Sequence, residues 1–187
     1  MRIIGGKYRG KKIVPPSHKS TRPTSDRTRE TMFNILLHNP AFGSKVLKDK
    51  AVLDVFAGTG ALGLEAFSRG AKSVVFIEND KDTLAILYTN TDAFGLSSSS
   101  ILEQDATQLR MALSVPFNLI FLDPPYGKNL ILPVLTHLYT QGWLSQDTVV
   151  VIEMAKNESL ILPSYLELVT ERISGSAKVL FCFTHAS

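Results

Sequence analysis

The sequence predicts an α/β protein with a doubly wound, largely parallel sheet. From residue 51 onward, short apolar runs alternate with segments of helical periodicity, which is typical of parallel strands joined by crossover helices. The apolar runs are continuous rather than alternating, as expected when helices cover both faces of the sheet. The chain has 187 residues, which is enough for one hydrophobic core and favours a single main domain.

Before residue 51 the sequence predicts a small hairpin and one helix. Short apolar runs at 2–4 and 11–14 flank a glycine-rich turn, which is the pattern of a β-hairpin. An extended loop should follow, and Ser25 or Asp26 can cap the helix after it. The apolar face of this helix has a three- and four-residue spacing and comprises Met32, Phe33, Leu36 and Leu37.

After residue 51 each strand and helix follows from the alternating pattern. Strands are expected at 51–56, 73–78, 100–103, 117–123 and 148–153, with helices at 62–69, 82–94, 106–113 and 130–141 between them. Two more strands, at 166–173 and 178–184, are joined too closely to be parallel. We therefore expect the chain to close with an antiparallel hairpin.

Positive charge is concentrated at the N-terminus, although the formal net charge of the chain is only +3. Residues 1–29 hold nine lysines and arginines against one acid, Asp26, whereas the rest holds eleven bases against sixteen acids. A basic arm on an acidic body favours a polyanionic partner, whose phosphates the arm would neutralise. A merely solvated terminus would have the same composition.

Other features argue against several classes of protein. No run of about twenty apolar residues occurs, so we expect no membrane-spanning helix, and the N-terminus lacks the apolar stretch of a secretion signal. The single cysteine, Cys182, excludes an internal disulfide and argues against a thiolate metal cluster. The four histidines lack metal-ligand spacing. We therefore expect a cytoplasmic protein without a metal site.

A glycine-rich loop follows the first predicted strand. Gly58-x-Gly60-x-x-Gly63 fits the fingerprint of dinucleotide-binding proteins, and Glu78 ends the next strand, where an acid would bind ribose hydroxyls. This interpretation leads to an NAD-dependent oxidoreductase. Asp54 precedes the glycines, however, and a carboxylate there repels a pyrophosphate but suits a ligand with an amino group. The loop therefore indicates an adenosine-containing cofactor without a pyrophosphate.

The tetrapeptide Asp123-Pro124-Pro125-Tyr126 follows the fourth predicted strand of the alternating region. It could be a proline-stiffened turn and nothing more. Its place at the carboxyl end of a strand beside the first strand is, however, where open α/β sheets bind ligands. The Asp123 carboxylate and the Pro124 carbonyl could accept the N–H groups of an exocyclic amine, while Tyr126 stacks on an extruded base. Such a site suits direct, in-line methyl transfer to the amine.

Two segments resemble known methyltransferase motifs. Residues 54–60, Asp-Val-Phe-Ala-Gly-Thr-Gly, resemble the cofactor loop of class I methyltransferases. Residues 123–126 resemble the signature of enzymes that methylate adenine N6, cytosine N4 or guanine N2. The resemblance implies S-adenosylmethionine as cofactor, with the glycines against its methionine and ribose portions. It also implies that Glu78 binds the ribose and that Asp105 contacts the adenine.

The N-terminal blocks at 2–10 and 22–30 resemble the RsmD-type family, bacterial methyltransferases of guanine N2 in small-subunit ribosomal RNA. This resemblance covers nearly the whole chain. It implies a Rossmann-like, seven-stranded sheet with an antiparallel last hairpin, a basic RNA-binding arm over 1–23 and a methyltransferase domain over 24–187. It further implies that the partner is ribosomal RNA within the small subunit or an assembly intermediate. The sequence leaves the oligomeric state open, and we expect a monomer. Arg27 and Arg29 could each touch phosphate or neighbours of the first helix.

Together these arguments give a set of candidate site residues. The predicted catalytic residues are Asp123, Pro124 and Tyr126. The predicted cofactor-binding residues, of which the first two line the mouth of the site in the RsmD-type resemblance, are Arg22, Thr24, Asp54, Phe56, Gly58, Thr59, Gly60, Glu78, Asn79, Asp105, Ala106 and Asp123.

Three other functions stay open at the level of sequence. A DNA adenine-N6 methyltransferase would use the same tetrapeptide, but the chain has no room for a separate DNA-recognition domain. An NAD-dependent oxidoreductase fits the glycines, but no group for hydride transfer is evident. A non-catalytic RNA-binding module fits the basic arm, but the intact Asp123 and Tyr126 argue against lost catalysis.

Overall fold

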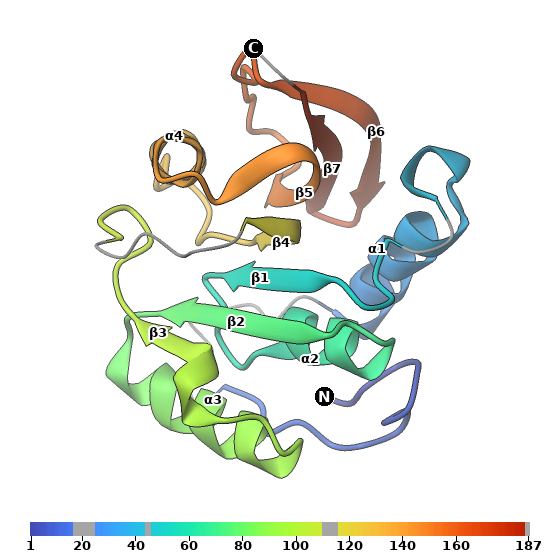
Figure 1. The fold of residues 1–187 in the computed structure, drawn as a ribbon, viewed down its shortest axis with the longest axis vertical. Helices are drawn as coiled ribbons and strands as arrows, with labels where there is room; N and C mark the ends of the chain where they lie inside the picture. Colours follow the sequence, from blue (N-terminus) through green and yellow to red (C-terminus); the bar gives the residue numbers. More distant parts are fainter. Residues whose placement is uncertain (17–24, 44–45, 110–115, 186–187) are drawn as a thin grey trace.

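The computed structural model describes residues 1–16, 25–43, 46–109 and 116–185, and these form a sheet of seven strands with helices on both faces (Figure 1). The strands are β1 (Ala51–Val55), β2 (Ser73–Glu78), β3 (Ile101–Glu103), β4 (Phe117–Leu122), β5 (Leu144–Ala155), β6 (Leu166–Ser174) and β7 (Ala177–Thr184). Their order across the sheet is β3-β2-β1-β4-β5-β7-β6. Six strands run in the same direction, and β7 runs antiparallel to β5 and β6 on either side of it. This confirms the predicted fold class and the closing hairpin.

The register of the central strands aligns their carboxyl ends. Val55 of β1 pairs with Leu122 of β4, and Leu122 pairs with Ile152 of β5. The residues that follow these positions therefore meet at one edge of the sheet. In a doubly wound sheet this is the edge where ligands bind, beside the point at which the strand order reverses.

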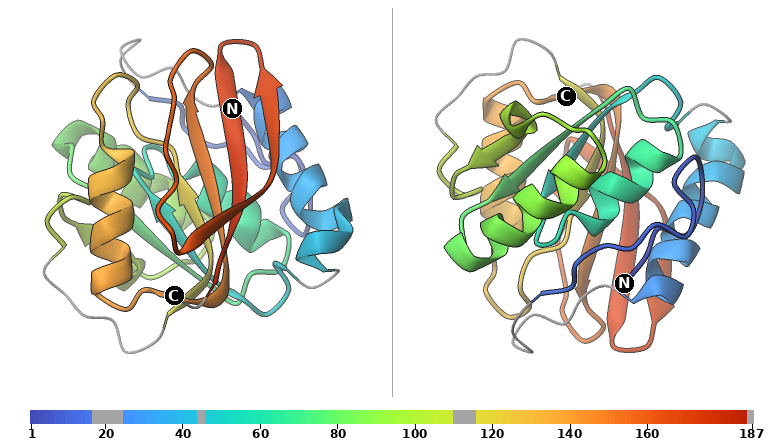
Figure 2. Two further views of the ribbon diagram at one scale, coloured as in Figure 1. Left: turned by 90° about the horizontal axis from the view of Figure 1, so that it is seen from above. Right: turned by 90° about the horizontal axis from the view of Figure 1, so that it is seen from below.

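The helices are distributed over the two faces of the sheet and are α1 (Asp26–His38), α2 (Ala61–Ser68), α3 (Lys81–Ala93) and α4 (Ile131–Thr140), with short 3₁₀ turns at Pro40–Phe42 and Ser98–Ser100. Side chains of α1, α2 and α3 share one apolar cluster, and those of α4 belong to a second. Consecutive strand residues such as Val52 and Leu53 point into opposite clusters, as the alternation of a strand requires. Figure 2 shows α4 on the face opposite α2 and α3.

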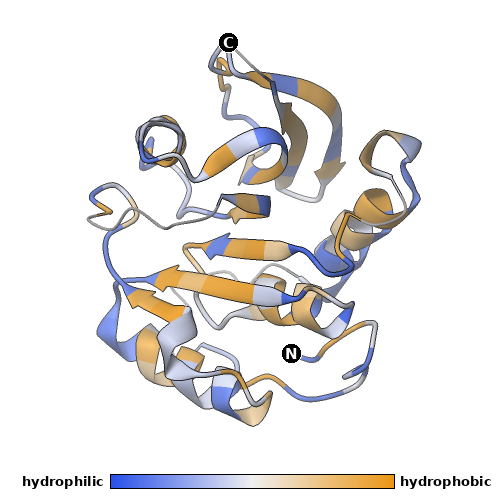
Figure 3. Cartoon of the chain, viewed as in Figure 1, coloured by the Kyte–Doolittle hydropathy of each residue, from blue (hydrophilic) through white to orange (hydrophobic). Residues whose placement is uncertain are grey.

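The predicted N-terminal hairpin is present only as a single antiparallel bridge between Arg2 and Lys12. Ile3 and Ile13 are nevertheless buried in the cluster of α1 to α3. The ladder is short because the N–H groups of residues 4, 5, 7 and 8 donate to Glu65 and Ser68 of α2 rather than to a second strand. The hairpin is therefore attached to the core through its backbone and lies beside α2 in the lower part of Figure 1. Figure 3, in the same view, shows that β1 and β2 are mostly hydrophobic.

Several boundaries differ from the sequence-based expectation. β5 begins four residues before the predicted strand, because Leu144 already pairs with Phe117 of β4. Within the predicted helix 106–113, the described residues 106–109 form a turn rather than a helix. Ser100, predicted to begin a strand, instead ends a 3₁₀ turn over Ser98–Ser100, and β3 begins at Ile101. No helix of the described residues has the length and hydropathy needed to cross a membrane.

Candidate active site

The glycines after β1 serve different purposes. Gly58 and Gly60 have φ angles of +56° and +80°, which side chains other than glycine rarely adopt, and Gly60 is the N-cap of α2. Gly63 has an ordinary φ but lies against β2, where an added Cβ would stand 2.4 Å from Cε1 of Phe76. The first two glycines therefore shape the loop, and the third lets α2 pack on the sheet. This division matches the roles of glycines in nucleotide-binding loops.

Asp54 is a buried carboxylate at the start of this loop. Its side chain is 1% exposed, and Oδ2 accepts a hydrogen bond of 2.8 Å from the N–H of Gly63. Burial raises the pKa of Asp54 well above its ordinary value, the Gly63 hydrogen bond lowers it, and the nearby Asp123 and Glu78 raise it further. A ligand that carries positive charge would reduce the repulsion among these three carboxyl groups, because a cation favours the ionised form of each.

Glu78 ends β2 and faces the glycine loop. Its Oε2 accepts from the N–H of Gly58 at 2.9 Å, and its Oε1 accepts from Asn79 and Asp80 at 2.8 Å and 2.9 Å. A carboxylate offers about four acceptor sites, so these three bonds leave one on Oε2. The side chain is thereby fixed in place while it keeps the capacity to accept a hydroxyl.

The remaining predicted cofactor residues lie along the same edge. Phe56 follows β1 with a φ of +61°, an uncommon angle for a bulky residue that turns the chain into the loop. Asp105 follows β3, is exposed, and its Oδ1 accepts from both the N–H and the hydroxyl of Thr107. Ala106 beside it is buried. Arg22 and Thr24 lie outside the described residues.

The carbonyl of Thr59 accepts a hydrogen bond from Asn90, a residue that was not predicted from the sequence. Asn90 of α3 is 2% exposed, and its Nδ2 donates to the carbonyl of Thr59 at 2.9 Å and to that of Val14 at 3.1 Å. Its Oδ1 accepts from the N–H of Val14 at 2.8 Å. One buried amide therefore joins the end of the N-terminal hairpin to the glycine loop.

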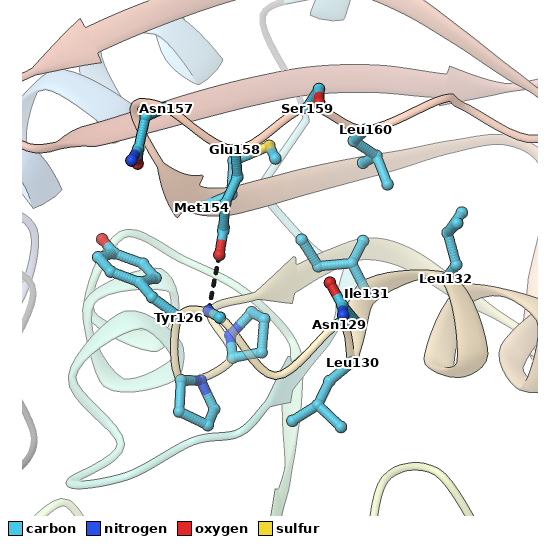
Figure 4. Close-up of a pocket in the computed structure, with 13 residues that line it drawn as sticks. Tyr126, Asn129, Leu130, Ile131, Leu132, Met154, Asn157, Glu158, Ser159 and Leu160 are labelled. Atoms are coloured by element: carbon cyan, nitrogen blue, oxygen red, sulfur yellow. Dashed lines mark hydrogen bonds between the residues drawn. The ribbon is translucent and has the colours of Figure 1, made fainter.

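The tetrapeptide after β4 forms the other half of the edge. Asp123 is half-buried and Pro124 is buried, whereas Pro125 and Tyr126 are exposed. The Tyr126 hydroxyl donates to Oε1 of Glu153 at 2.8 Å. The N–H of Gly127 donates to Oε1 of Glu158, which lies just after β5 (Figure 4). The turn is therefore bound by one carboxylate of β5 and by one of the segment that follows it.

Two pockets flank Tyr126. The first, of about 300 Å³, lies between the tetrapeptide, the start of α4 and the segment 157–160 (Figure 4). The second, of about 420 Å³, lies toward α1 and is lined by Tyr126, Glu153, the N-terminal half of α1 and residues 172–177 of the closing hairpin. The Thr28 and Ser174 hydroxyls are 3.2 Å apart and link α1 to that hairpin. Both pockets open beside the predicted catalytic turn.

Sequence analysis left the roles of Arg27 and Arg29 open, and the structure separates them. Arg29 is fully buried and donates to the carbonyl of Arg2 at 2.6 Å and to Oδ1 of Asp26 at 2.8 Å. Burial lowers its pKa, while Asp26 and Glu65 raise it. Arg29 therefore holds the N-terminal segment against α1 and does not face a phosphate. Arg27 is exposed and lines the pocket on the α1 side.

Three further carboxylates were not predicted from the sequence: Glu153, Glu158 and Glu65. The sequence does contain a signal for Glu153 and Glu65. Glu153 is the only charge in the apolar run 149–154, and Glu65 stands among apolar residues of α2. An acid at a position that must be buried requires partners, and this requirement marks it as structural or functional. Glu158 lies in an irregular segment without such a pattern.

The described residues give little support to a metal site or to a cysteine nucleophile. In the described ranges no group of three His, Cys, Asp or Glu side chains is placed to hold a metal ion. Cys182 is buried in β7, and this burial raises the pKa of its thiol to about 12. A thiol in that state is a poor nucleophile at neutral pH.

Comparison with known proteins gives a consistent result. The family model described as conserved hypothetical protein 95 matches residues 1–183. A protein of Escherichia coli strain K12 named ribosomal RNA small subunit methyltransferase D is 34% identical over 176 residues, which cover 94% of this chain and 85% of that protein. The Haemophilus influenzae protein of the same name is 35% identical over 179 residues, covering 94% and 89%. The solved structure of the Escherichia coli protein yhhF matches with a TM-score of 0.84 and 32% identity, covering 100% of this chain and 99% of that one.

Proposed function

This chain belongs to the conserved hypothetical protein 95 family, and on that premise we propose that it transfers a methyl group from S-adenosylmethionine to the N2 amine of a guanine in small-subunit ribosomal RNA. The observation that carries the proposal is the convergence at one edge of the sheet. The register of β1, β4 and β5 brings the glycine loop with Asp54 beside the tetrapeptide that begins at Asp123. Asp123 is close enough to influence the ionisation of Asp54.

The residues at the β1 and β2 ends fit the cofactor. The open acceptor site of Glu78 suits a ribose hydroxyl, and the acidic pair of Asp54 and Asp123 suits the cationic amino acid portion. An added Cβ at Gly58 would meet only the carbonyl oxygen of Phe56, at 3.9 Å, so a ligand can approach the loop backbone closely. When bound, S-adenosylmethionine supplies a sulfonium methyl group. The other predicted contacts are Phe56, Thr59, Gly60, Asn79, Asp105 and Ala106, with Arg22 and Thr24 at the mouth.

The residues after β4 would act on the acceptor base. An exocyclic amine is a weak nucleophile because its lone pair is delocalised into the ring. In our proposal the Asp123 carboxylate and the Pro124 carbonyl accept its two N–H groups and orient the nitrogen toward the methyl group. The ring of Tyr126 provides a face for a base taken out of its stack. Orientation then supplies most of the acceleration, and no metal ion or covalent intermediate is needed.

The N-terminal segment supports RNA as the polymer that carries this base. Arg2, Lys7, Arg9 and Lys12 are all exposed. The segment is fixed to α2 through its backbone, so these four side chains are not needed to attach it, whereas Lys11 binds the carbonyl of Ala93 in α3. We propose that residues 1–23 form the RNA-binding arm and 24–187 the methyltransferase domain. The natural substrate would be the small subunit or an assembly intermediate in the cytoplasm, bound by a monomer.

The direct test is methyl transfer from labelled S-adenosylmethionine to unmodified small ribosomal subunits, followed by digestion to nucleosides. We expect label in N2-methylguanosine. If DNA is supplied as the acceptor in a parallel reaction, label in N6-methyldeoxyadenosine would support the adenine enzyme instead. Binding of NAD without binding of S-adenosylmethionine would support the oxidoreductase.

Asp123→Ala separates catalysis from binding. Transfer should fall by roughly 1,000-fold or more, because a group that orients the nucleophile is lost, while RNA affinity stays within about twofold. Asp92→Ala, at an exposed position of α3, is the matched control and should leave transfer unchanged. Undiminished transfer in Asp123→Ala would contradict the proposed mechanism.

A further inference from the structure

A carboxylate buried in the wall of the pocket on the α1 side has no role in the function proposed above. Glu153 is 5% exposed and lines this pocket together with Tyr126. It follows Ile152, which pairs with Leu122, so Glu153 of β5 stands beside Asp123, the residue that follows β4. Neighbouring strands are about 4.8 Å apart, so the two acids flank one site.

The tetrapeptide alone does not determine which base is methylated. Acceptors at Asp123 and Pro124 suit the exocyclic amine of adenine, cytosine or guanine equally well. The three bases differ at the ring nitrogen next to that amine. In guanine this nitrogen, N1, carries a hydrogen and donates, whereas adenine N1 and cytosine N3 carry a lone pair and accept. A group that reads this one position therefore distinguishes guanine from the other two.

We infer that Glu153 is the specificity-determining residue of the acceptor site and accepts the N1–H of an extruded guanine while Asp123 and Pro124 hold its N2 amine. This inference rests on the proposed function and names the edge of the base that the site reads. An ionised carboxylate only accepts hydrogen bonds, so it binds guanine N1–H and repels the lone pair of adenine N1 or cytosine N3. A carboxylate offers about four acceptor sites, and the Tyr126 hydroxyl occupies one of them, on Oε1.

The rest of the pocket suits a nucleotide with its base inserted. Arg27 of α1 and Arg172 of β6 are both exposed lining residues, placed at the rim where phosphates of an extruded nucleotide would lie. The Thr28–Ser174 contact holds the two elements that carry these arginines together. The pocket thus combines a negative wall with positive groups at its rim, which matches a guanine edge attached to a phosphate backbone.

The test uses a base analogue that keeps the 2-amino group of guanine but lacks both its N1 hydrogen and its O6. Small subunits are reconstituted on RNA that carries guanine, 2-aminopurine or adenine at the methylated position. 2-Aminopurine keeps the 2-amino group but has a lone pair at N1. The wild-type protein should prefer guanine over 2-aminopurine by about 100-fold or more, because a site built to accept a hydrogen bond rejects an analogue that lacks the donor.

Glu153→Gln should lower guanine methylation about 100-fold and reduce the preference over 2-aminopurine to a few-fold, because an amide can either accept from or donate to N1. Glu153→Asp should be slower but keep the preference. Tyr126→Phe should also keep it, since the carboxylate stays. Glu167→Gln, exposed on β6, is the matched control. Affinity for S-adenosylhomocysteine should stay within about twofold in all four variants, which shows that they are folded.

The outcomes distinguish this inference from the proposed function. If the wild-type protein methylates guanine but Glu153→Gln keeps the full preference over 2-aminopurine, Glu153 does not read the base. If Tyr126→Phe loses the preference as fully as Glu153→Gln, Glu153 acts only by holding the tyrosine, and the inference is also wrong. If the wild-type protein labels no guanine at all, the proposed function itself fails.

Discussion

Carboxylates stand at both halves of the same sheet edge, but they are held in different ways. At the ends of β1 and β2, Asp54 and Glu78 accept hydrogen bonds from backbone N–H groups of the loop and of the helix starts. In β5, beside the end of β4, Glu153 instead accepts a hydrogen bond from the side chain of Tyr126. Backbone groups therefore hold Asp54 and Glu78, whereas a side chain holds Glu153.

The difference explains which of these acids can be recognised as site residues in a sequence. A backbone-built site needs particular glycines at fixed spacing, so Gly58 and Gly60 identify it directly. A site built from side chains depends on the fold: Tyr126 and Glu153 are 27 residues apart, and Thr28 and Ser174 are 146 apart. The cofactor half therefore tolerates little change in backbone, whereas the acceptor half can change specificity by single side-chain substitutions.

The largest effect that we expect is a loss of stability when the N-terminal segment is no longer attached to α2 in the cofactor half. Glu65→Ala should lower the free energy of unfolding by about 3–5 kcal/mol, because it removes a buried acid that faces buried positive charge. Glu65 accepts from Ile4, Gly5 and Arg69, and Arg29 lies nearby. Urea unfolding measures the change, with the exposed Glu30→Ala as control. A loss below about 1 kcal/mol would mean that the segment is attached by its apolar residues alone.

A smaller loss is expected where α2 packs on β2. Gly63→Ala should cost about 2 kcal/mol, because the new methyl group overlaps Phe76 and Val74 in a packed core. Gly142→Ala is a useful comparison: nothing lies within 4 Å of its Cβ position, so only its φ of +71° is strained. Thermal unfolding should show the larger loss for Gly63→Ala. The opposite order would show that backbone angle, not space, is the requirement.

Asn90→Ala tests whether the cofactor loop depends on the N-terminal segment. The variant removes the amide that bonds both Val14 and Thr59, so the KM for S-adenosylmethionine should rise about tenfold, the equivalent of one lost hydrogen bond to a buried group. kcat at saturating cofactor should change little. Asn34→Ala, exposed on α1, is the control. An equal fall in kcat with an unchanged KM would contradict this role.

The smallest effect that we expect is a change in how the free energy of unfolding depends on pH, caused by Asp54. Its pKa is raised in the folded protein, so folding is favoured by the protonated form, and this contribution is lost as pH rises from the ordinary value of 3.8 through the folded pKa. Asp54→Asn keeps an acceptor for Gly63 and should remove this loss. Unfolding measured without cofactor across pH should give a flatter profile for the variant. A profile identical to that of the wild-type protein would contradict the raised pKa.

The sequence predicted the sheet, its closing hairpin and the position of the two motifs, because hydrophobic periodicity and glycine or proline punctuation are local signals. It did not predict that the N-terminal hairpin would have only one bridge, since the competing hydrogen bonds to Glu65 and Ser68 come from 60 residues away. It also could not assign Arg29, whose burial depends on how α1 meets the N-terminal segment. Glu153 has a local signal as the lone charge of an apolar run, but its place in the site follows only from the fold, which brings it beside Asp123 and Tyr126.

The most direct test of the two-part site measures cofactor affinity and methyl transfer on the same two variants, Glu78→Gln and Glu153→Gln. Calorimetry with S-adenosylhomocysteine should show affinity at least about tenfold weaker for Glu78→Gln and within about twofold of wild type for Glu153→Gln. Transfer to guanine at saturating cofactor should be reduced chiefly in Glu153→Gln. If Glu153→Gln instead weakens cofactor binding as much as Glu78→Gln does, the two halves are not separate and the account is wrong.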